Sequence, residues 1–108
     1  MKEIRAYIQP YMLNHVTHAL MEIPDFPGMS VSNCEGFGRE RAETGNEYQP
    51  FYGKKRIEIF AADDMAGIIF DTIMRIAHTG HHGDGKAYIV DAIQGGRIST
   101  GEKGPELA

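Results

Sequence analysis

Residues 54–93, KKRIEIFAADDMAGIIFDTIMRIAHTGHHGDGKAYIVDAI, decide the fold of this chain. In the first part Ile57 and Ile59 alternate with Arg56 and Glu58, which is typical of a strand with one buried face. The last part, residues 86–93, is apolar and also favours a strand. Between them, apolar residues recur at helical spacing, and the predicted buried stripe comprises Met65, Ile68, Ile69, Ile73, Met74 and Ala77. The stretch therefore predicts strand, helix, strand.

The ends of this helix also carry signals. Asp63 and Asp64 are predicted to cap its N-terminus, where the positive end of the helix favours carboxylates. Gly80 suits a left-handed turn at its C-terminal end.

The first half of the chain has the same organisation. In residues 2–9, Ile4, Ala6 and Ile8 share one side of a predicted strand, and Lys2, Glu3 and Arg5 mark its start and its solvent-facing side. Pro10 ends the strand, residues 11–23 are amphipathic at helical spacing, and residues 29–38 form a second predicted strand. Residues 39–53 are polar, contain Gly and Pro, and predict a long loop.

The order strand, helix, strand, loop, strand, helix, strand predicts an α+β fold of the ferredoxin-like βαββαβ type. Right-handed crossovers then give a four-stranded antiparallel sheet with both helices on one face. The other face, expected to be rich in Ile, Tyr and Val, would remain uncovered. We therefore expect subunits to associate through it.

Composition narrows the class of protein. With 108 residues the chain is expected to be a single domain, 1–108, and its net charge of −4, without a clustered basic surface, argues against nucleic-acid binding. No segment suits a membrane span or a signal peptide, so a cytoplasmic protein without membrane insertion is expected. Cys34, the single cysteine, can form neither an intrachain disulfide nor a cysteine-based zinc site, and is expected to be a buried thiol.

Residues 78–86, HTGHHGDGK, are the strongest chemical signal. Gly80, Gly85 and Lys86 match part of a P-loop, but Ala87 replaces its Ser or Thr, and the segment runs from helix to strand instead of strand to helix. A P-loop is therefore excluded, although backbone N–H groups and a lysine can still bind an anion.

Histidines offer a second reading of the same region. His78, His81 and His82 cluster here, and His15 and His18 lie one helical turn apart in residues 11–23, so either group is a metal candidate, with a solvated role favoured. No nucleophile, base and orienting residue come together, which predicts a binding protein and not an enzyme.

Several motifs together carry a family resemblance. MKEIRAYIQP (1–10), GMSVSNCEGFGR (28–39), KRIEIF (55–60) followed by DD, HTGHHGDGK (78–86) and RISTGE (97–102) stand in the order and spacing of the PII signal-transduction proteins. The chain resembles this family over nearly its whole length outside the long loop.

The resemblance implies a homotrimer that binds ATP, ADP or AMP in clefts between subunits. It also implies that residues 39–54 form the flexible T-loop, which regulates partner proteins such as transporters, enzymes or transcriptional regulators, and that residues 95–108 form a C-terminal region.

Functional residues follow by position from the same resemblance. Gly36, Phe37, Gly38 and Arg39 would line the nucleotide cleft, and Ser30 matches a Thr that touches the base. Lys54 matches a lysine near the phosphates and the effector. Phosphates would be held by Gly83, Asp84, Gly85 and Lys86, and by Arg97 of a neighbouring subunit.

The sequence also departs from the family pattern. Glu40 replaces a glutamine that helps to bind Mg²⁺ and 2-oxoglutarate, so a carboxylate would repel that dianion. Ser99 replaces an arginine, which favours ADP or AMP over more highly charged nucleotides. The predicted loop is shorter than in nitrogen-regulatory members, and its Tyr48 and Tyr52 are candidate partner contacts. The alternative function is a metal-responsive or metal-binding trimer that uses His15, His18, His81 and His82 in metal homeostasis.

Overall fold

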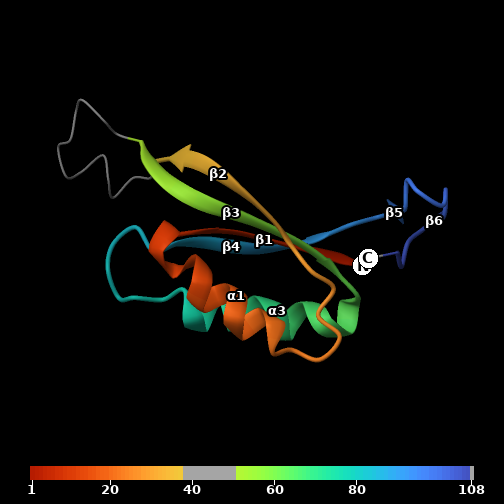
Figure 1. The fold of residues 1–108 in the computed structure, drawn as a ribbon, viewed down its shortest axis with the longest axis horizontal. Coiled ribbons are helices and arrows are strands. Elements are labelled where there is room, and N and C mark those ends of the chain that lie inside the picture. The colour runs from red at the N-terminus through yellow and green to blue at the C-terminus, as the bar shows by residue number, and fades with distance from the viewer. Residues whose placement is uncertain (38–50, 108) are drawn as a thin grey trace.

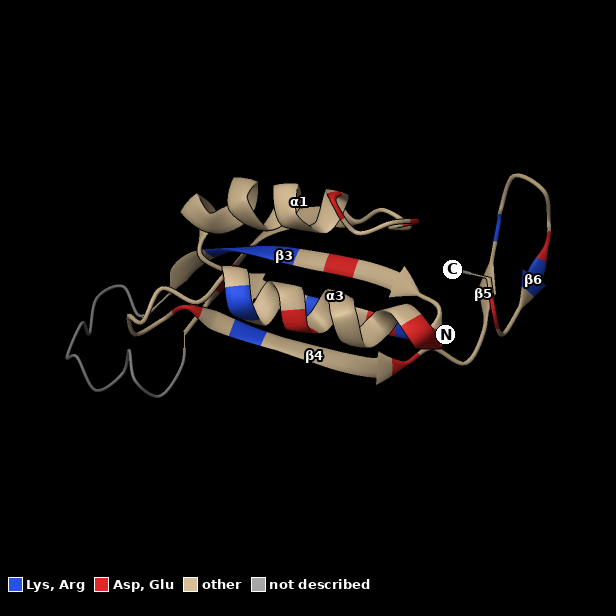
Figure 2. Ribbon diagram, turned by 90° about the horizontal axis from the view of Figure 1, so that it is seen from below, with Lys and Arg blue, Asp and Glu red and all other residues tan. Residues whose placement is uncertain are grey.

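A computed structural model describes residues 1–37 and 51–107 (Figure 1). The helical elements are η1 (Pro10–Met12), α1 (Leu13–Met21) and α3 (Asp63–Ile76). The strands are β1 (Lys2–Ile8), β2 (Ser30–Gly36), β3 (Tyr52–Ala61), β4 (Gly85–Asp91), β5 (Gly95–Gly96) and β6 (Lys103–Gly104). Four strands form an antiparallel sheet in the order β2-β3-β1-β4, and both α-helices cover one face of it (Figure 2). The predicted ferredoxin-like fold is confirmed.

The core lies between the sheet and these helices. Ile4, Ala6 and Ile8 of β1 point toward the helices and are fully or almost fully buried, as the alternation predicted. Their partners on β3 are Ile59, Ile57 and Lys55, and the helices add Val16, Leu20, Ala66, Ile69 and Ile73 to the core. Each large side chain buried here contributes about 1.5–3 kcal/mol, so this layer provides most of the stabilisation within one subunit.

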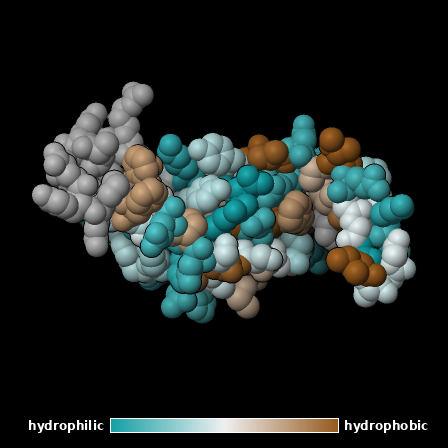
Figure 3. Space-filling model, turned by 90° about the horizontal axis from the view of Figure 1, so that it is seen from above, coloured by the Kyte–Doolittle hydropathy of each residue, from teal (hydrophilic) through white to brown (hydrophobic). Residues whose placement is uncertain are grey.

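The open face of the sheet differs from the expectation. Its isoleucines point toward the helices, and the open face carries charged residues beside Tyr7, Phe60, Tyr88 and Val90. Polar side chains extend across this face in Figure 3. Glu3 is only 7% exposed, although it was expected to face solvent, because Arg5 of the same strand forms two hydrogen bonds with its carboxylate, at 2.7 and 3.1 Å.

The helix ends correct two further expectations. Ala62 is the N-cap of α3 and no side chain caps it, so Asp63 and Asp64 lie in the first turn instead. The Asp63 carboxylate accepts a hydrogen bond from the Met1 ammonium at 2.8 Å, and this bond lowers its pKa. Gly80 does have a left-handed φ of 85°, but it lies beyond the C-cap, Ala77, in the loop that follows.

The C-terminal region forms more structure than the polar tail that was expected. Strands β5 and β6 pair as a short hairpin at the end of the molecule where β3 ends and β4 leaves the sheet (Figure 1). Near and within this hairpin, Ile93 is 87% exposed and Ile98 fully exposed. No helix in residues 1–37 or 51–107 has the length and apolar character needed to cross a membrane.

Candidate functional site

A pocket of about 780 Å³ opens at the end of the sheet where β2 ends and β3 begins. Its volume lies in the usual range for small-molecule sites. The lining comes from all four strands of the large sheet and from the loop between α3 and β4: Tyr7, Cys34, Glu35, Gly36, Phe37, Tyr52, Lys54, His78, Gly80, His81, His82, Gly83, Asp84, Gly85, Lys86 and Tyr88.

Glycines shape the loop from residue 77 to 85. Gly80, Gly83 and Gly85 have φ angles of 85°, 83° and 111°, which residues other than glycine rarely adopt. Gly85 is also where β4 joins β1, and a Cβ atom there would lie 1.7 Å from the Tyr7 carbonyl oxygen. The backbone conformation of the loop therefore requires glycine at these positions, whether or not the loop also binds an anion.

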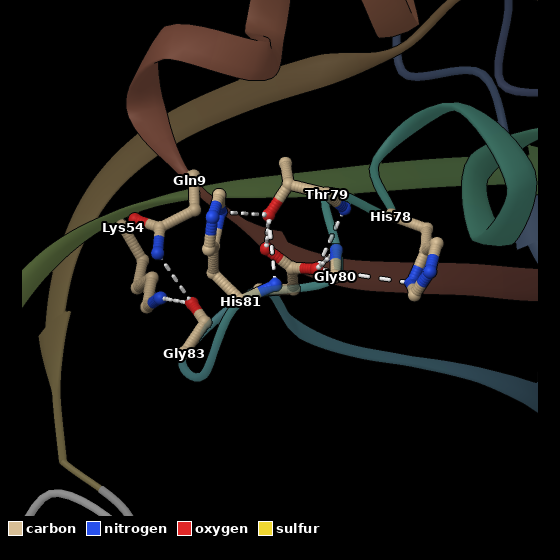
Figure 4. Close-up of polar contacts among 8 residues, drawn as sticks. Gln9, Lys54, His78, Thr79, Gly80, His81 and Gly83 are labelled. Atoms are coloured by element: carbon tan, nitrogen blue, oxygen red, sulfur yellow. Dashed lines mark hydrogen bonds and ion pairs between the residues drawn. The ribbon is translucent and has the colours of Figure 1, made fainter.

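Asp84 holds this loop from within. Its carboxylate accepts hydrogen bonds from the backbone N–H of Thr79 at 2.7 Å and of Gly80 at 3.1 Å, and from the Thr79 hydroxyl (Figure 4). Desolvation raises the pKa of Asp84, but these hydrogen bonds and the nearby His78 ring outweigh it, so the pKa lies below its ordinary value. The side chain predicted to hold phosphates thus turns into the loop and acts on its conformation.

The Gly83 carbonyl is fixed from outside the loop. It accepts a hydrogen bond from Gln9 Nε2 at 2.7 Å and another from Lys54 Nζ, which reach it from the end of β1 and from β3 (Figure 4). Lys54 therefore lies beside the glycine loop, although the two are far apart in the sequence. An ammonium has three donors, so a lysine at this position can make more than one contact.

Seven of the predicted site residues meet in this pocket. These are Gly36, Phe37, Lys54, Gly83, Asp84, Gly85 and Lys86. The Phe37 ring lies edge-on to Phe51, with ring centres 4.9 Å apart, so the last residue described after β2 contacts the first described before β3.

Other predicted residues lie elsewhere in the chain. Ser30 pairs with Glu58 in the ladder and is not part of the lining. Arg97 follows β5, and Figure 1 places that hairpin at the opposite end of the sheet from the pocket. Its predicted role, contributed from a neighbouring subunit, stays a prediction. Gly38, Arg39, Glu40 and Tyr48 lie outside the described residues, as does most of the predicted loop 39–54, of which residues 52–54 belong to β3.

Some residues of the site were missed or misjudged. Cys34 is half-buried in the pocket wall, not buried in the core, because β2 is an edge strand and the residue shares its open face with Lys54. Gln9 and Thr79 were not predicted as site residues. Thr79 stands inside the quoted motif, whereas Gln9 had no signal beyond its place at the end of a strand.

Within residues 1–37 and 51–107 the histidines do not form a metal site. His78, His81 and His82 line the pocket, while His15 and His18 are exposed on α1. In the part of the chain that is described, no three or more His, Cys, Asp or Glu side chains come together to hold a metal ion. The described residues therefore add no observation in support of the metal alternative.

The fold is ferredoxin-like, and a glycine-rich loop borders its pocket. Residues 1–102 match the family model for nitrogen regulatory protein P-II. Two relatives, nitrogen regulatory protein P-II of Klebsiella oxytoca and nitrogen regulatory protein P-II 1 of Escherichia coli K12, are each 43% identical over 108 residues, covering 95% of this chain and 96% of theirs. A third, nitrogen regulatory protein P-II of Microchaete diplosiphon, is 40% identical over 111 residues and 98% of both chains. The chain belongs to the nitrogen regulatory protein P-II family.

Proposed function

We propose that this chain forms a homotrimer that binds adenine nucleotides (ATP, ADP or AMP) between subunits and regulates a partner protein in the cytoplasm, such as a transporter or an enzyme. The single observation that carries this proposal is the pocket of about 780 Å³ in which the glycine loop, Lys54 and Lys86 meet. Family membership supports it, since the loop and the strand carry the motifs that the resemblance assigned to nucleotide binding.

The open sheet face and the hairpin support the proposed assembly. Phe60, Tyr88 and Val90 are 43–48% exposed on that face, and Ile98 is fully exposed on the hairpin. Exposed apolar side chains set among charged ones are compatible with a subunit interface that has both apolar and polar contacts. The resemblance implies that Arg97 of a neighbouring subunit contacts the phosphates in such an assembly. Light scattering should give three times the mass of one chain.

Regulation would act through the predicted T-loop, residues 39–54, since Phe37 shortly before it and Lys54 at its end both line the pocket. Nucleotide would favour one arrangement of that segment, and the partner would bind that arrangement. With Ser99 in place of an arginine, we expect ADP or AMP to bind at least as well as ATP. Mg²⁺ would assist ATP through its phosphates, and Glu40 disfavours 2-oxoglutarate as an effector.

Titration calorimetry with ATP, ADP and AMP tests the proposal. Lys86→Ala should weaken binding about tenfold, because it removes a charge-assisted contact to phosphate. Lys55→Ala is the matched control, since Lys55 neighbours Lys54 but lies on the opposite face of β3, where it bonds Asn33. Nucleotide should be recovered unchanged, as expected of a protein that is not an enzyme. No binding of any of the three at millimolar concentration would overturn the proposal.

A further inference from the structure

The charges of the described pocket lining balance when its histidines are neutral. Lys54 and Lys86 supply two positive charges, and Glu35 and Asp84 supply two negative ones. Nucleotide phosphates bring several negative charges. The remaining ionisable side chains of the described lining, apart from Cys34 and three tyrosines, are His78, His81 and His82. Imidazole is the side chain that ordinarily changes charge between about pH 5 and 8.

Hydrogen bonding fixes the tautomer of one of these rings. The Thr79 hydroxyl donates its only proton to Asp84, so the same oxygen can only accept from other groups. It accepts from the backbone N–H of His81 at 3.3 Å, and His81 Nδ1 lies 3.2 Å from it (Figure 4). Nδ1 must therefore carry a proton, and in the neutral ring Nε2 is a bare acceptor.

This tautomer makes the ring's behaviour toward phosphate depend on its charge. A neutral His81 offers a phosphate only the Nε2 lone pair, which a phosphate oxygen cannot use. Protonation at Nε2 converts that atom into a positively charged donor without disturbing the Thr79 contact. Protonation therefore alters phosphate binding more here than in a ring whose neutral form could place its proton on Nε2.

We propose that His81 is a phosphate-binding residue of the pocket that acts only in its protonated form, so that nucleotide affinity rises as pH falls. The proposal rests on the nucleotide site proposed above and names a further ligand residue within it. Phosphate beside Nε2 favours the protonated ring, so nucleotide binding is accompanied by proton uptake.

Charged groups from the neighbouring elements share the pocket lining with His81. They are Asp84 on the loop, Glu35 on β2, Lys54 on β3 and Lys86 on β4. His78 Nδ1 lies 3.8 Å from the Asp84 carboxylate oxygen that also accepts the Thr79 backbone N–H, and His82 follows His81 in the loop. Tyr7 on β1, Tyr52 on β3, Tyr88 on β4 and Cys34 on β2 complete the titratable lining.

The test compares ATP dissociation constants of the native protein and His81→Asn at about pH 6, 7 and 8. Asparagine can still donate to Thr79 but has no Nε2. ATP itself titrates in this range, and the ratio of the two constants at each pH cancels that effect. We expect a ratio near one at pH 8 and about fivefold weaker binding by the variant at pH 6, from one charge-assisted hydrogen bond at an exposed site.

Two further variants sharpen the result. His81→Lys carries its charge at every pH, so it should bind ATP more tightly than the native protein at pH 8. His15→Asn removes an exposed histidine of α1, outside the pocket, and should follow the native protein throughout.

Calorimetry in buffers of different ionisation enthalpy gives an independent reading. Native protein should take up protons on binding ATP near pH 7, and His81→Asn should take up fewer. If the native protein binds ATP but the ratio of the two dissociation constants is the same at pH 6 and pH 8, this proposal is overturned and the proposed nucleotide site stands. Absence of ATP binding at every pH would overturn both.

Discussion

Substitution of Gly85 by alanine tests the structural account of the pocket most directly. Gly85 ends the glycine loop, begins β4 and pairs with Ile8 of β1. Its φ is 111°, and an added Cβ would lie 1.7 Å from the Tyr7 carbonyl oxygen and 2.8 Å from the carbonyl carbon. Both atoms belong to the backbone of the central strand, so no side-chain rotation can relieve the contact.

The cost follows from these distances. Ordinary contacts begin near 3.4 Å, so β4 would have to move away from β1 by more than an ångström at this point. That movement would weaken about two ladder hydrogen bonds, at about 1 kcal/mol each. The positive φ adds about 1–2 kcal/mol for any residue with a side chain. We expect Gly85→Ala to lower the free energy of unfolding by about 3–4 kcal/mol, a large part of the total for a small domain.

Gly80→Ala provides the matched control. Gly80 lies in the same loop with a φ of 85°, but an added Cβ there meets no atom within 4 Å, so it should lose only the 1–2 kcal/mol of the backbone term. Urea unfolding followed by circular dichroism suits a chain without tryptophan. The proteins are compared at equal concentration because the proposed assembly would contribute to stability. If Gly85→Ala lost no more than Gly80→Ala, the close approach of β4 to Tyr7 would be refuted.

Three further substitutions test how the loop is held. Asp84→Asn should lower stability by about 1 kcal/mol at pH 7. The pKa of Asp84 is lowered in the folded state, so its ionised carboxylate stabilises the fold above the ordinary carboxyl pKa. This stabilisation is lost as pH falls through the folded pKa, and the unfolding curves of the native protein and the variant should therefore converge in acid. A difference in stability that stayed constant with pH would contradict this. Thr79→Val should cost about 1 kcal/mol through loss of the hydroxyl bond while the backbone bond remains; an unchanged urea midpoint would contradict it. Gln9→Ala should weaken ATP binding about threefold in calorimetry by releasing Gly83, with Gln94→Ala as the control outside the pocket; equal affinities would show that Gln9 does not position the loop.

The sheet was predictable because its signal is local. Ile4, Ala6 and Ile8 alternate in sequence and alternate in burial, and the chirality of the two crossovers left one arrangement of the four strands. The expectation that isoleucines would lie on the open face was wrong. Alternation shows that one side of a strand is apolar but not which face of the sheet that side forms, and here it faces the helices. Glu3 is buried beneath Arg5, which donates a hydrogen bond to its carboxylate. Both residues are charged, so the sequence alone placed both of them in solvent.

The contacts that hold the site were less predictable, because they join distant parts of the chain. Gln9 reaches a carbonyl 74 residues away, and no local pattern marks that pairing. Asp63 was expected at a cap but pairs with the Met1 ammonium, so its partner came from tertiary structure. The hairpin of β5 and β6 was missed because its strands are two residues long and glycine-rich, which gives no periodicity to detect.

The loop's internal bonds connect stability to binding. Hydrogen bonds of Asp84 and Gln9 hold residues 79–84 without a ligand, so entropy is lost in ordering the loop on folding and not on the proposed nucleotide binding. A pocket arranged in this way would bind more tightly than a flexible loop with the same contacts. Variants that loosen the loop should therefore lose affinity even when the substituted side chain touches no ligand, which distinguishes Gln9 from Lys86 in the experiments above.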